Sequence, residues 1–187
     1  MARFIFALAV LLILTALVFG AYKLAGFISE TMNKEVEVTT VTVTKSGNIK
    51  QTIIEDFDKS LYDESALKKD IEDKAKASGG GVEVEDFVAE DGKVTVKLKY
   101  KSDDDMASFN DEVFYADTVD ALIKEGVSFD SDAIKSGAKH AVIVSESMDI
   151  RCPQKIQYAD GAMKIDDKDP KLAHCSVEDG QIAFVLY

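Results

Sequence analysis

The sequence predicts an α+β protein in which an N-terminal transmembrane helix precedes a mostly antiparallel sheet. Three observations predict this fold: a long uncharged run near the N-terminus, a strand-strand-helix pattern that occurs twice in outline, and a series of short strand segments separated by turn dipeptides in the last third of the chain. We therefore expect two strand-strand-helix units followed by a C-terminal β-meander, with the helices packed on one face of the sheet.

The N-terminal run is long enough to cross a bilayer. Residues 4–22 carry no charge and are rich in Leu, Ile, Val, Phe and Ala, and an apolar segment continues beyond Lys23. A helix rises about 1.5 Å per residue, so this run comes close to the roughly 30 Å hydrocarbon core. We predict a transmembrane signal-anchor over residues 1–28, with the lipid bilayer as the partner of residues 4–28.

A cleaved signal peptide is the alternative for the same residues. Val18-Phe19-Gly20 before Ala21 is an imperfect cleavage site, and the run is longer than the usual apolar region of a signal peptide, so the uncut anchor is favoured. An apolar N-terminal segment followed by one long acidic domain is the ordinary layout of an exported protein. We expect a single-pass protein of the cell membrane with residues 29–187 outside the cytoplasm.

The remainder of the chain is strongly acidic. The protein has 22 Lys and Arg against 34 Asp and Glu, a formal charge of -12. Such a surface repels phosphate, so no nucleic-acid partner is expected. Residues 29–35 are predicted to be a short polar stalk, and residues 36–187 an extracytoplasmic α+β domain that divides, if at all, near residues 127–138.

The first strand-strand-helix unit follows the stalk. Alternating apolar residues on either side of a Ser-Gly-Asn turn predict a hairpin of residues 36–43 and 49–57. Asp63 is expected to cap a helix that runs to about Ala77, because an aspartate at this position accepts a hydrogen bond from the first turn. Three glycines from Gly79 onward end that helix.

The second unit repeats the pattern. Residues 82–87 and 94–100 are predicted to form a hairpin around Asp91-Gly92, a dipeptide that accepts positive φ. Ser102 is expected to cap the next helix, and a short second helix follows from about Thr118. The apolar stripe of the first of these helices is predicted to comprise Met106, Phe109, Val113 and Phe114, and that of the second Val119, Leu122 and Ile123.

After a loop at residues 127–138 the character of the sequence changes to short strands. Residues 141–144 predict a strand that is buried on both faces. Turn dipeptides such as Asp160-Gly161 and Asp179-Gly180 separate the segments that follow. The predicted strands of the meander are residues 148–152, 155–159, 162–166, 171–177 and 181–187.

Few residues offer nucleophilic or metal chemistry. If residues 171–177 form a strand, His174 and Cys175 point to opposite faces and cannot bind one ion. Outside the cytoplasm Cys152 and Cys175 could form a disulfide that stabilises the fold by about 3 kcal/mol, whereas a reducing habitat would leave both thiols free. The sequence leaves these two states open.

The acidic clusters do not predict a metal site. The carboxylates of Asp103, Asp104 and Asp105 lie in the first turn of a helix, where the helix dipole favours acids. The loop at Asp166–Asp169 departs from the EF-hand pattern, with Leu172 where glycine is required. We expect no metal and no cofactor, and a solvated turn in the second cluster.

Short segments of the chain resemble a group of cell-envelope proteins. Residues 54–58, 102–110 and 155–158 are similar to uncharacterised predicted lipoproteins of Gram-positive gut anaerobes. The resemblance implies a cell-envelope location. The chain departs from the lipoprotein pattern because Ala21, and not cysteine, follows Gly20, so no lipid can be attached there. Either the protein anchor replaces the lipid or the domain is released.

Two functions remain in competition. No Gly-x-Ser-x-Gly, Walker or His-Glu-x-x-His motif occurs. The leading expectation is a membrane-anchored extracytoplasmic domain of non-catalytic binding or envelope-assembly type, with an unknown ligand and no enzymatic activity. The alternative is an extracytoplasmic hydrolase that uses paired carboxylates among Glu55, Asp56, Asp58 and Asp63.

Overall fold

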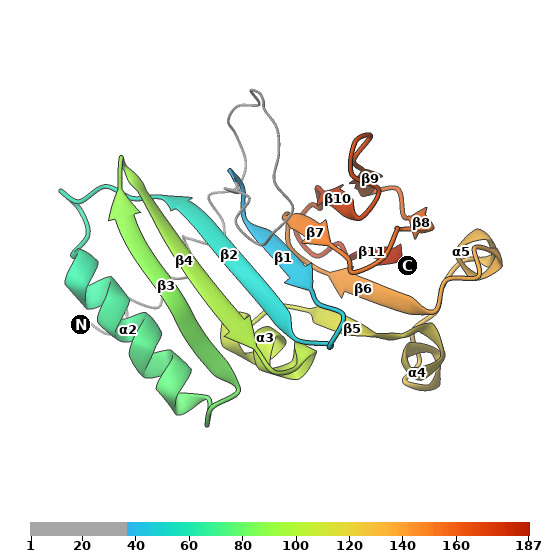
Figure 1. The fold of residues 1–187 in the computed structure, drawn as a ribbon, viewed down its shortest axis with the longest axis horizontal. Helices are drawn as coiled ribbons and strands as arrows, with labels where there is room; N and C mark the ends of the chain where they lie inside the picture. The colour runs from blue at the N-terminus through green and yellow to red at the C-terminus, as the bar shows by residue number, and fades with distance from the viewer. Residues whose placement is uncertain (1–36) are drawn as a thin grey trace. The chain divides into compact units, whose positions relative to one another are not determined.

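Two β-sheets organise residues 37–187, which are the residues that the computed structural model describes (Figure 1). The larger sheet has seven strands in the order β3-β4-β2-β1-β7-β10-β9, and the smaller has four in the order β5-β6-β11-β8. The predicted anchor and stalk lie outside the described residues. Within residues 37–187, no helix is long and apolar enough to cross a membrane.

The first strand-strand-helix unit is confirmed, with its second strand and its helix close to their predicted bounds. It comprises β1 (Thr40–Val43), β2 (Ile49–Asp56) and α2 (Glu64–Ala77). The side chain of Asp63 accepts a hydrogen bond from the backbone N–H of Ala66 at 2.9 Å, as expected of an N-cap. Strand β1 begins later than predicted, because its ladder with β2 begins at the pair Thr40–Thr52.

The second unit is also present, with a shorter helix than predicted. It comprises β3 (Val82–Glu90), β4 (Lys93–Tyr100) and α3 (Asp103–Asn110). Asp91 and Gly92 adopt φ values of 51° and 74° in the β3–β4 turn, as the dipeptide predicts. The prediction that Val113 and Phe114 continue the helical stripe was wrong, because Asp111 takes a left-handed conformation with φ of 58° and ends α3.

Phe114 instead begins a strand that pattern reasoning missed. This strand is β5 (Phe114–Thr118), and it leads directly into α4 (Val119–Lys124), which Thr118 caps as predicted. The loop expected at residues 127–138 contains a further short helix, α5 (Ser131–Lys135). Ile123 was predicted to face inward but is 45% exposed, whereas Val119 and Leu122 of the same helix are buried as predicted.

The predicted meander was wrong in topology, although its strands exist. They are β6 (His140–Val144), β7 (Asp149–Arg151), β8 (Tyr158–Ala159), β9 (Met163–Ile165), β10 (Leu172–Cys175) and β11 (Ala183–Leu186). Only β9 and β10 among these strands pair in sequence order; the other successive strands lie in different sheets, and β7 lies parallel to β1. The larger sheet is therefore mixed, but β1–β7 is the one parallel pairing among the described residues, so the α+β fold is mostly antiparallel as expected.

Both sheets bury apolar side chains. In the larger sheet a row formed by Val41, Ile150 and Ala173 is fully buried across three adjacent strands. In the smaller sheet β6 is buried on both faces, as predicted. One face of β6 and β11 packs against α4 and α5 in a cluster formed by Val119, Leu122, Ala133, Ala141, Ile143 and Leu186.

Candidate functional site

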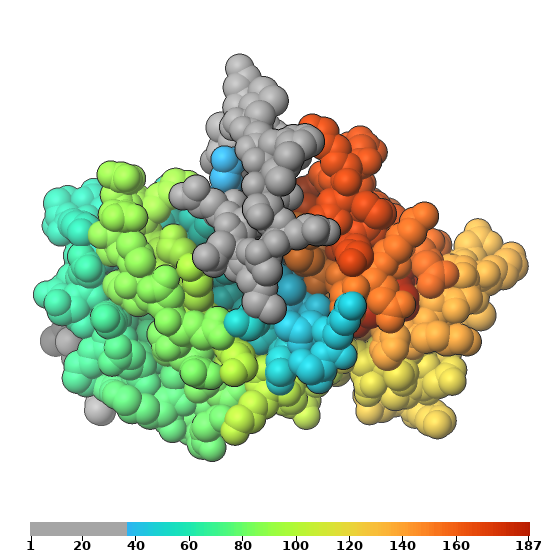
Figure 2. Space-filling view, in the orientation of Figure 1, coloured from blue at the N-terminus to red at the C-terminus, as the bar shows by residue number. Residues whose placement is uncertain are grey.

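A groove runs between helix α2 and strand β3, at the edge of the larger sheet. In Figure 1 the two elements lie beside one another, and Figure 2 shows their surfaces side by side at the left of the view. The groove is open to solvent and has a volume of about 610 Å³. Its lining residues are Lys68, Glu72, Ala75, Lys76, Gly80, Val82, Val84, Glu85, Asp86 and Phe87. We call it the α2–β3 groove.

The sequence builds this groove from two local features. Leu67 and Ala75 form the buried stripe of α2 and hold the helix against the sheet. Three glycines then let the chain reverse, and the side chain of Ser78 accepts a hydrogen bond from the N–H of Val82 at 3.2 Å. Strand β3 thus returns along the helix and leaves a furrow between them.

The outer edge of β3 is unpaired. Among residues 37–187, strand β3 is the terminal strand of the larger sheet and pairs only with β4. Within the described part of the chain, no backbone hydrogen bond joins residues 83–90 to any element outside the sheet. Backbone N–H and C=O groups on such an edge can pair with an added strand. The α2–β3 groove therefore borders a row of available hydrogen-bonding groups.

Acidic residues of β3 form ion pairs with lysines on the solvent-facing side of the sheet. Each of three acidic residues on this strand lies next to a lysine of β4 or β2. The nitrogen-to-oxygen distances are 3.2 Å for Lys99–Glu83, 3.3 Å for Lys97–Asp86 and 2.8 Å for Lys50–Glu85. These pairs are partly solvent-exposed, so each contributes little to stability. These ion pairs show that the acidic side chains of β3 lie on the same face of the sheet as the lysines of β4 and β2.

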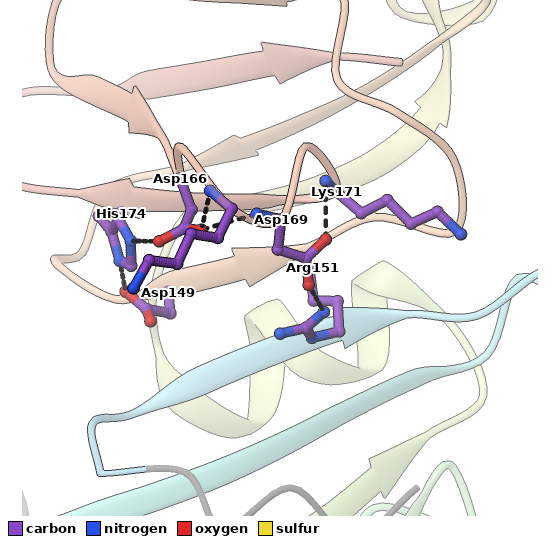
Figure 3. Close-up of polar contacts among 7 residues, drawn as sticks. Asp149, Arg151, Asp166, Asp169, Lys171 and His174 are labelled. Carbon is purple, nitrogen blue, oxygen red and sulfur yellow. Dashed lines mark hydrogen bonds and ion pairs between the residues drawn. The ribbon is translucent and has the colours of Figure 1, made fainter. Parts of the chain in front are cut away.

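A second cluster of polar side chains surrounds His174 on the larger sheet (Figure 3). The register of β7 and β10 places His174 opposite Asp149, and its Nδ1 lies 2.8 Å from an oxygen of that carboxylate. Its Nε2 lies 3.2 Å from a carboxylate oxygen of Asp166 in the loop after β9. Both ring nitrogens are therefore engaged, and neither is available to take a proton from a substrate.

The contacts of His174 with two carboxylates favour its protonated, charged form. Burial opposes protonation, but the hydrogen bonds to Asp149 and Asp166 and the charges of both carboxylates outweigh it and raise the pKa of His174. Arg151 forms a further ion pair with Asp169 in the same loop. The cluster thus clamps the β9–β10 loop onto β7, which is a structural role.

Substitution of His174 by glutamine is expected to cost stability mainly at low pH. The raised pKa means that the imidazolium stabilises the fold fully below about pH 6.5, its value when unfolded, and that this contribution disappears as the pH rises through the folded-state pKa. His174→Gln should lower the free energy of unfolding by about 1 kcal/mol at pH 6 and by less at pH 9. Urea denaturation at both pH values measures this, and an equal loss at both would contradict the clamp.

The carboxylates of the alternative hydrolase site are only partly brought together. Asp56 and Asp58 line an open groove of about 670 Å³ beside the β3–β4 turn, whereas Asp63 does not and caps α2 instead. Asp58 accepts hydrogen bonds from the hydroxyl and the N–H of Ser60, which lower its pKa. Burial, followed by the charge of Asp56, raises the pKa of Glu55 to about 7.

The two cysteines are far apart along the same pair of strands. Both thiols are free and buried. The N–H of Cys152 bonds to Lys171 and that of Cys175 bonds to Met148, so the cysteines lie at opposite ends of the β7–β10 ladder. Four strand positions span roughly 13 Å, and a disulfide needs Cα atoms within about 7 Å. This register disfavours the Cys152–Cys175 disulfide that the sequence left open.

Thiol titration is expected to find two free thiols in the unfolded chain and none that react quickly in the folded one. Burial raises the pKa of Cys152 to about 12 and that of Cys175 to about 11, so almost no thiolate is present at neutral pH. An aromatic disulfide reagent added before and after urea measures this. A chain that releases no thiol until it is reduced would instead establish the disulfide.

The remaining acidic clusters act locally. The hydroxyl of Ser102 accepts from the N–H of Asp105, and a carboxylate oxygen of Asp103 accepts from the N–H of Ala116. Asp166 accepts from the N–H groups of Lys168 and Asp169, which shapes the loop. Among residues 37–187, no group of three or more His, Cys, Asp or Glu side chains is placed to hold a metal ion.

A buried polar network lies beneath the larger sheet and was not foreseen. Gln51 Oε1 accepts hydrogen bonds from Tyr100 Oη at 2.6 Å and from Asn110 Nδ2 at 3.1 Å. Asn110 also donates to Glu112 Oε1 at 3.0 Å, and Glu112 Oε2 is buried with no hydrogen-bond partner among the residues that the structure describes. Burial, helped by the charge of Glu146, raises the pKa of Glu112 to about 7. No sequence signal distinguishes Gln51 or Glu112 from solvent-facing residues.

Comparison with known proteins adds no family to this geometry. No protein-family model, no curated protein and no solved structure matches the chain. The resemblance to predicted lipoproteins therefore stays a prediction from short segments of the sequence.

Proposed function

We propose that the chain is a membrane-anchored extracytoplasmic protein of non-catalytic binding or envelope-assembly type, and that it binds a partner protein through the α2–β3 groove. The observation that carries the proposal is the unpaired edge of β3, nine residues long, beside a helix-lined furrow. Strand edges next to a helix are suited to recognising polypeptide because the backbone supplies the hydrogen bonds and the furrow accommodates side chains.

The chemistry of the groove favours binding over catalysis. Its lining combines two lysines, three acids, one aromatic ring and small or apolar residues, and it contains no histidine, cysteine or serine. Nucleophilic catalysis needs an activated nucleophile beside a base, and this lining offers none. Elsewhere His174 has both nitrogens engaged, and Asp63 caps a helix.

The proposed location depends on residues 4–28, which lie outside the described residues. A protease added to intact cells that express the full chain should degrade residues 29–187, and it should leave a cytoplasmic control protein whole. The mass of the mature chain then separates an anchor from a cleaved signal peptide. Protection of the domain in intact cells, with degradation after lysis, would place it in the cytoplasm.

The binding function is tested by a photo-crosslinking residue placed in the groove. Glu72 lines the groove, and Asp70, on the opposite side of the same helix, is exposed and does not. We expect a crosslinked partner from position 72 and none from position 70 in intact cells, followed by binding of the purified partner to the full chain. Identical adducts from both positions, or none from either, would contradict the proposal.

The alternative hydrolase keeps one supporting observation. Asp56 and Asp58 face the same open groove, and the half-buried Glu55 nearby has a raised pKa. The purified full chain can be screened against ester, amide and glycoside substrates together with an Asp56→Asn, Asp58→Asn double variant. The binding proposal predicts no turnover by either protein, whereas turnover that the double variant loses would establish the hydrolase.

A further inference from the structure

We infer that the α2–β3 groove receives an extended segment of the partner as an added strand beside β3, and that this segment alternates basic with apolar residues. The inference rests on the proposed function and specifies the class of partner. It follows from the two faces of β3, from the strand that already pairs with its inner edge, and from the unpaired groups on its outer edge.

The register of β3 with β4 sorts the side chains of β3 onto two faces. Opposed residues of paired strands point to the same side. One side of β3 therefore carries three acids opposite lysines together with Val88 opposite Thr95, and the other carries apolar residues opposite apolar residues. The acidic pairs are Glu83 with Lys99, Asp86 with Lys97 and Glu90 with Lys93, and the apolar pairs are Val84 with Leu98, Phe87 with Val96 and Ala89 with Val94.

Strand β4 shows what kind of neighbour β3 accepts. Its sequence, Lys-Val-Thr-Val-Lys-Leu-Lys-Tyr over residues 93–100, alternates basic or hydroxyl side chains with apolar ones. The acidic side chains of β3 lie beside the lysines of β4 along the edge that pairs with β4. They are accessible from the unpaired edge of β3, and the side chain of Glu83 is 65% exposed. An added strand with the same alternation meets the same row of carboxylates from outside.

The face of β3 that lines the α2–β3 groove is apolar and suits the apolar side chains of an added strand. Val84 and Phe87 line the furrow together with Ala75 of α2, and the ammonium of Lys68 lies 6.0 Å from the centre of the Phe87 ring. Apolar side chains of an added strand would lie over these residues and over the aliphatic stem of Lys68. Basic residues at alternate positions would then point toward the acidic face.

A second copy of the chain fits this edge poorly. Pairing β3 with β3 would bring two acidic rows together, and like charges that face each other across strands oppose pairing. The opposite edge of the larger sheet, strand β9, has only three residues, so it offers a much shorter ladder. Charge and length therefore both favour a basic strand from another protein at β3.

The test uses the full chain in a zwitterionic detergent and a fluorescent peptide with the sequence of residues 93–100. We expect saturable binding by fluorescence anisotropy, and binding at least about tenfold weaker for a peptide whose three lysines are glutamates. Glu83→Lys combined with Glu90→Lys should weaken binding of the lysine peptide by about tenfold. Glu125→Lys with Glu178→Lys makes the same charge change at exposed positions away from β3 and should leave binding unchanged.

The outcomes separate this inference from the proposed function. Failure of the lysine peptide to bind, with a partner still captured from position 72, overturns the inference and leaves the binding function. Equal affinity for the glutamate peptide, or equal weakening by the control variant, also overturns it. Absence of both peptide binding and capture removes both proposals. Far-ultraviolet circular dichroism confirms that each variant is folded before its binding is compared.

Discussion

Gln51→Ala is expected to lower the free energy of unfolding by about 4 kcal/mol. Gln51 is 3% exposed, and its Oε1 accepts hydrogen bonds from Tyr100 Oη and Asn110 Nδ2. Truncation removes the acceptor shared by two donors. A buried donor left unpaired costs about 1–3 kcal/mol, and the missing side chain also leaves a cavity. Urea denaturation followed by circular dichroism measures the loss.

Tyr100→Phe is the matched control for that substitution. It removes one of the two donors and leaves Gln51 bonded to Asn110, so the expected loss is about 1 kcal/mol. The large difference between the variants identifies the shared acceptor as the source of the effect. Equal losses would mean that the Tyr100–Gln51 hydrogen bond accounts for the whole effect and that the shared acceptor adds nothing to it.

Glu112→Gln is expected to stabilise the fold by about 2 kcal/mol at pH 8 and to change it little at pH 4.5. Burial raises the pKa of Glu112 from 4.5 to about 7 in the folded state. Between pH 4.5 and about pH 7 the unfolded chain releases the proton of Glu112 while the folded chain retains it, so the wild type loses stability as the pH rises. Above about pH 7 the penalty is complete, because the charged carboxylate stays buried.

Glutamine mimics the protonated acid and therefore removes this pH dependence. One pKa unit corresponds to about 1.4 kcal/mol, and part of the gain is lost because an amide donor then occupies the position of the unpartnered oxygen. Unfolding free energies of both proteins at pH 4.5, 6 and 8 measure the effect. Parallel curves for wild type and variant would show that Glu112 is charged and well solvated in the folded protein.

Glu55 is expected to make the stability of the wild type fall with rising pH, in the same direction as Glu112. Its pKa is also raised to about 7, with burial as the main cause, and it lies at the far end of β2 from Gln51. The wild type should therefore lose stability between pH 5 and pH 8 through two separate carboxyl groups. Glu112→Gln is expected to remove only part of that slope.

Local signals in the sequence account for the elements that were predicted well. Asp63 marks the start of α2, and Asp91-Gly92 marks the β3–β4 turn, because each acts through contacts or dihedral angles within a few residues. The alternation of β4 likewise predicts a half-buried strand. These features depend on neighbours along the chain, which a single sequence displays.

Long-range pairing explains what the sequence did not predict. The parallel contact of β1 with β7 joins residues more than a hundred positions apart, and it has no local signature. The same is true of β5, which Asp111 separates from α3 by a left-handed turn. Gln51 is buried only because Tyr100 and Asn110 converge on it, and its alternation pattern would equally fit a solvent-facing strand residue.

The sequence predicted the helix and the hairpin that form the α2–β3 groove, but it did not predict that β3 lies at the edge of the sheet. Helix α2 and the β3–β4 hairpin were both expected from the sequence. That β3 is an edge strand follows from the order β3-β4-β2-β1, in which β4 lies between its hairpin partner and β2. The α2–β3 groove thus arises from sheet order, whereas the carboxylates near Asp56, which the sequence did suggest, are divided between a groove and a helix cap.

Hydrogen–deuterium exchange of the full chain, with and without the lysine peptide, tests strand addition at β3 most directly. We predict that amides within residues 83–90 exchange more slowly when the peptide is bound, and that amides of the opposite edge strand, residues 163–165, are unaffected. Unchanged exchange in β3 at saturating peptide, or equal slowing at both edges, would contradict the account.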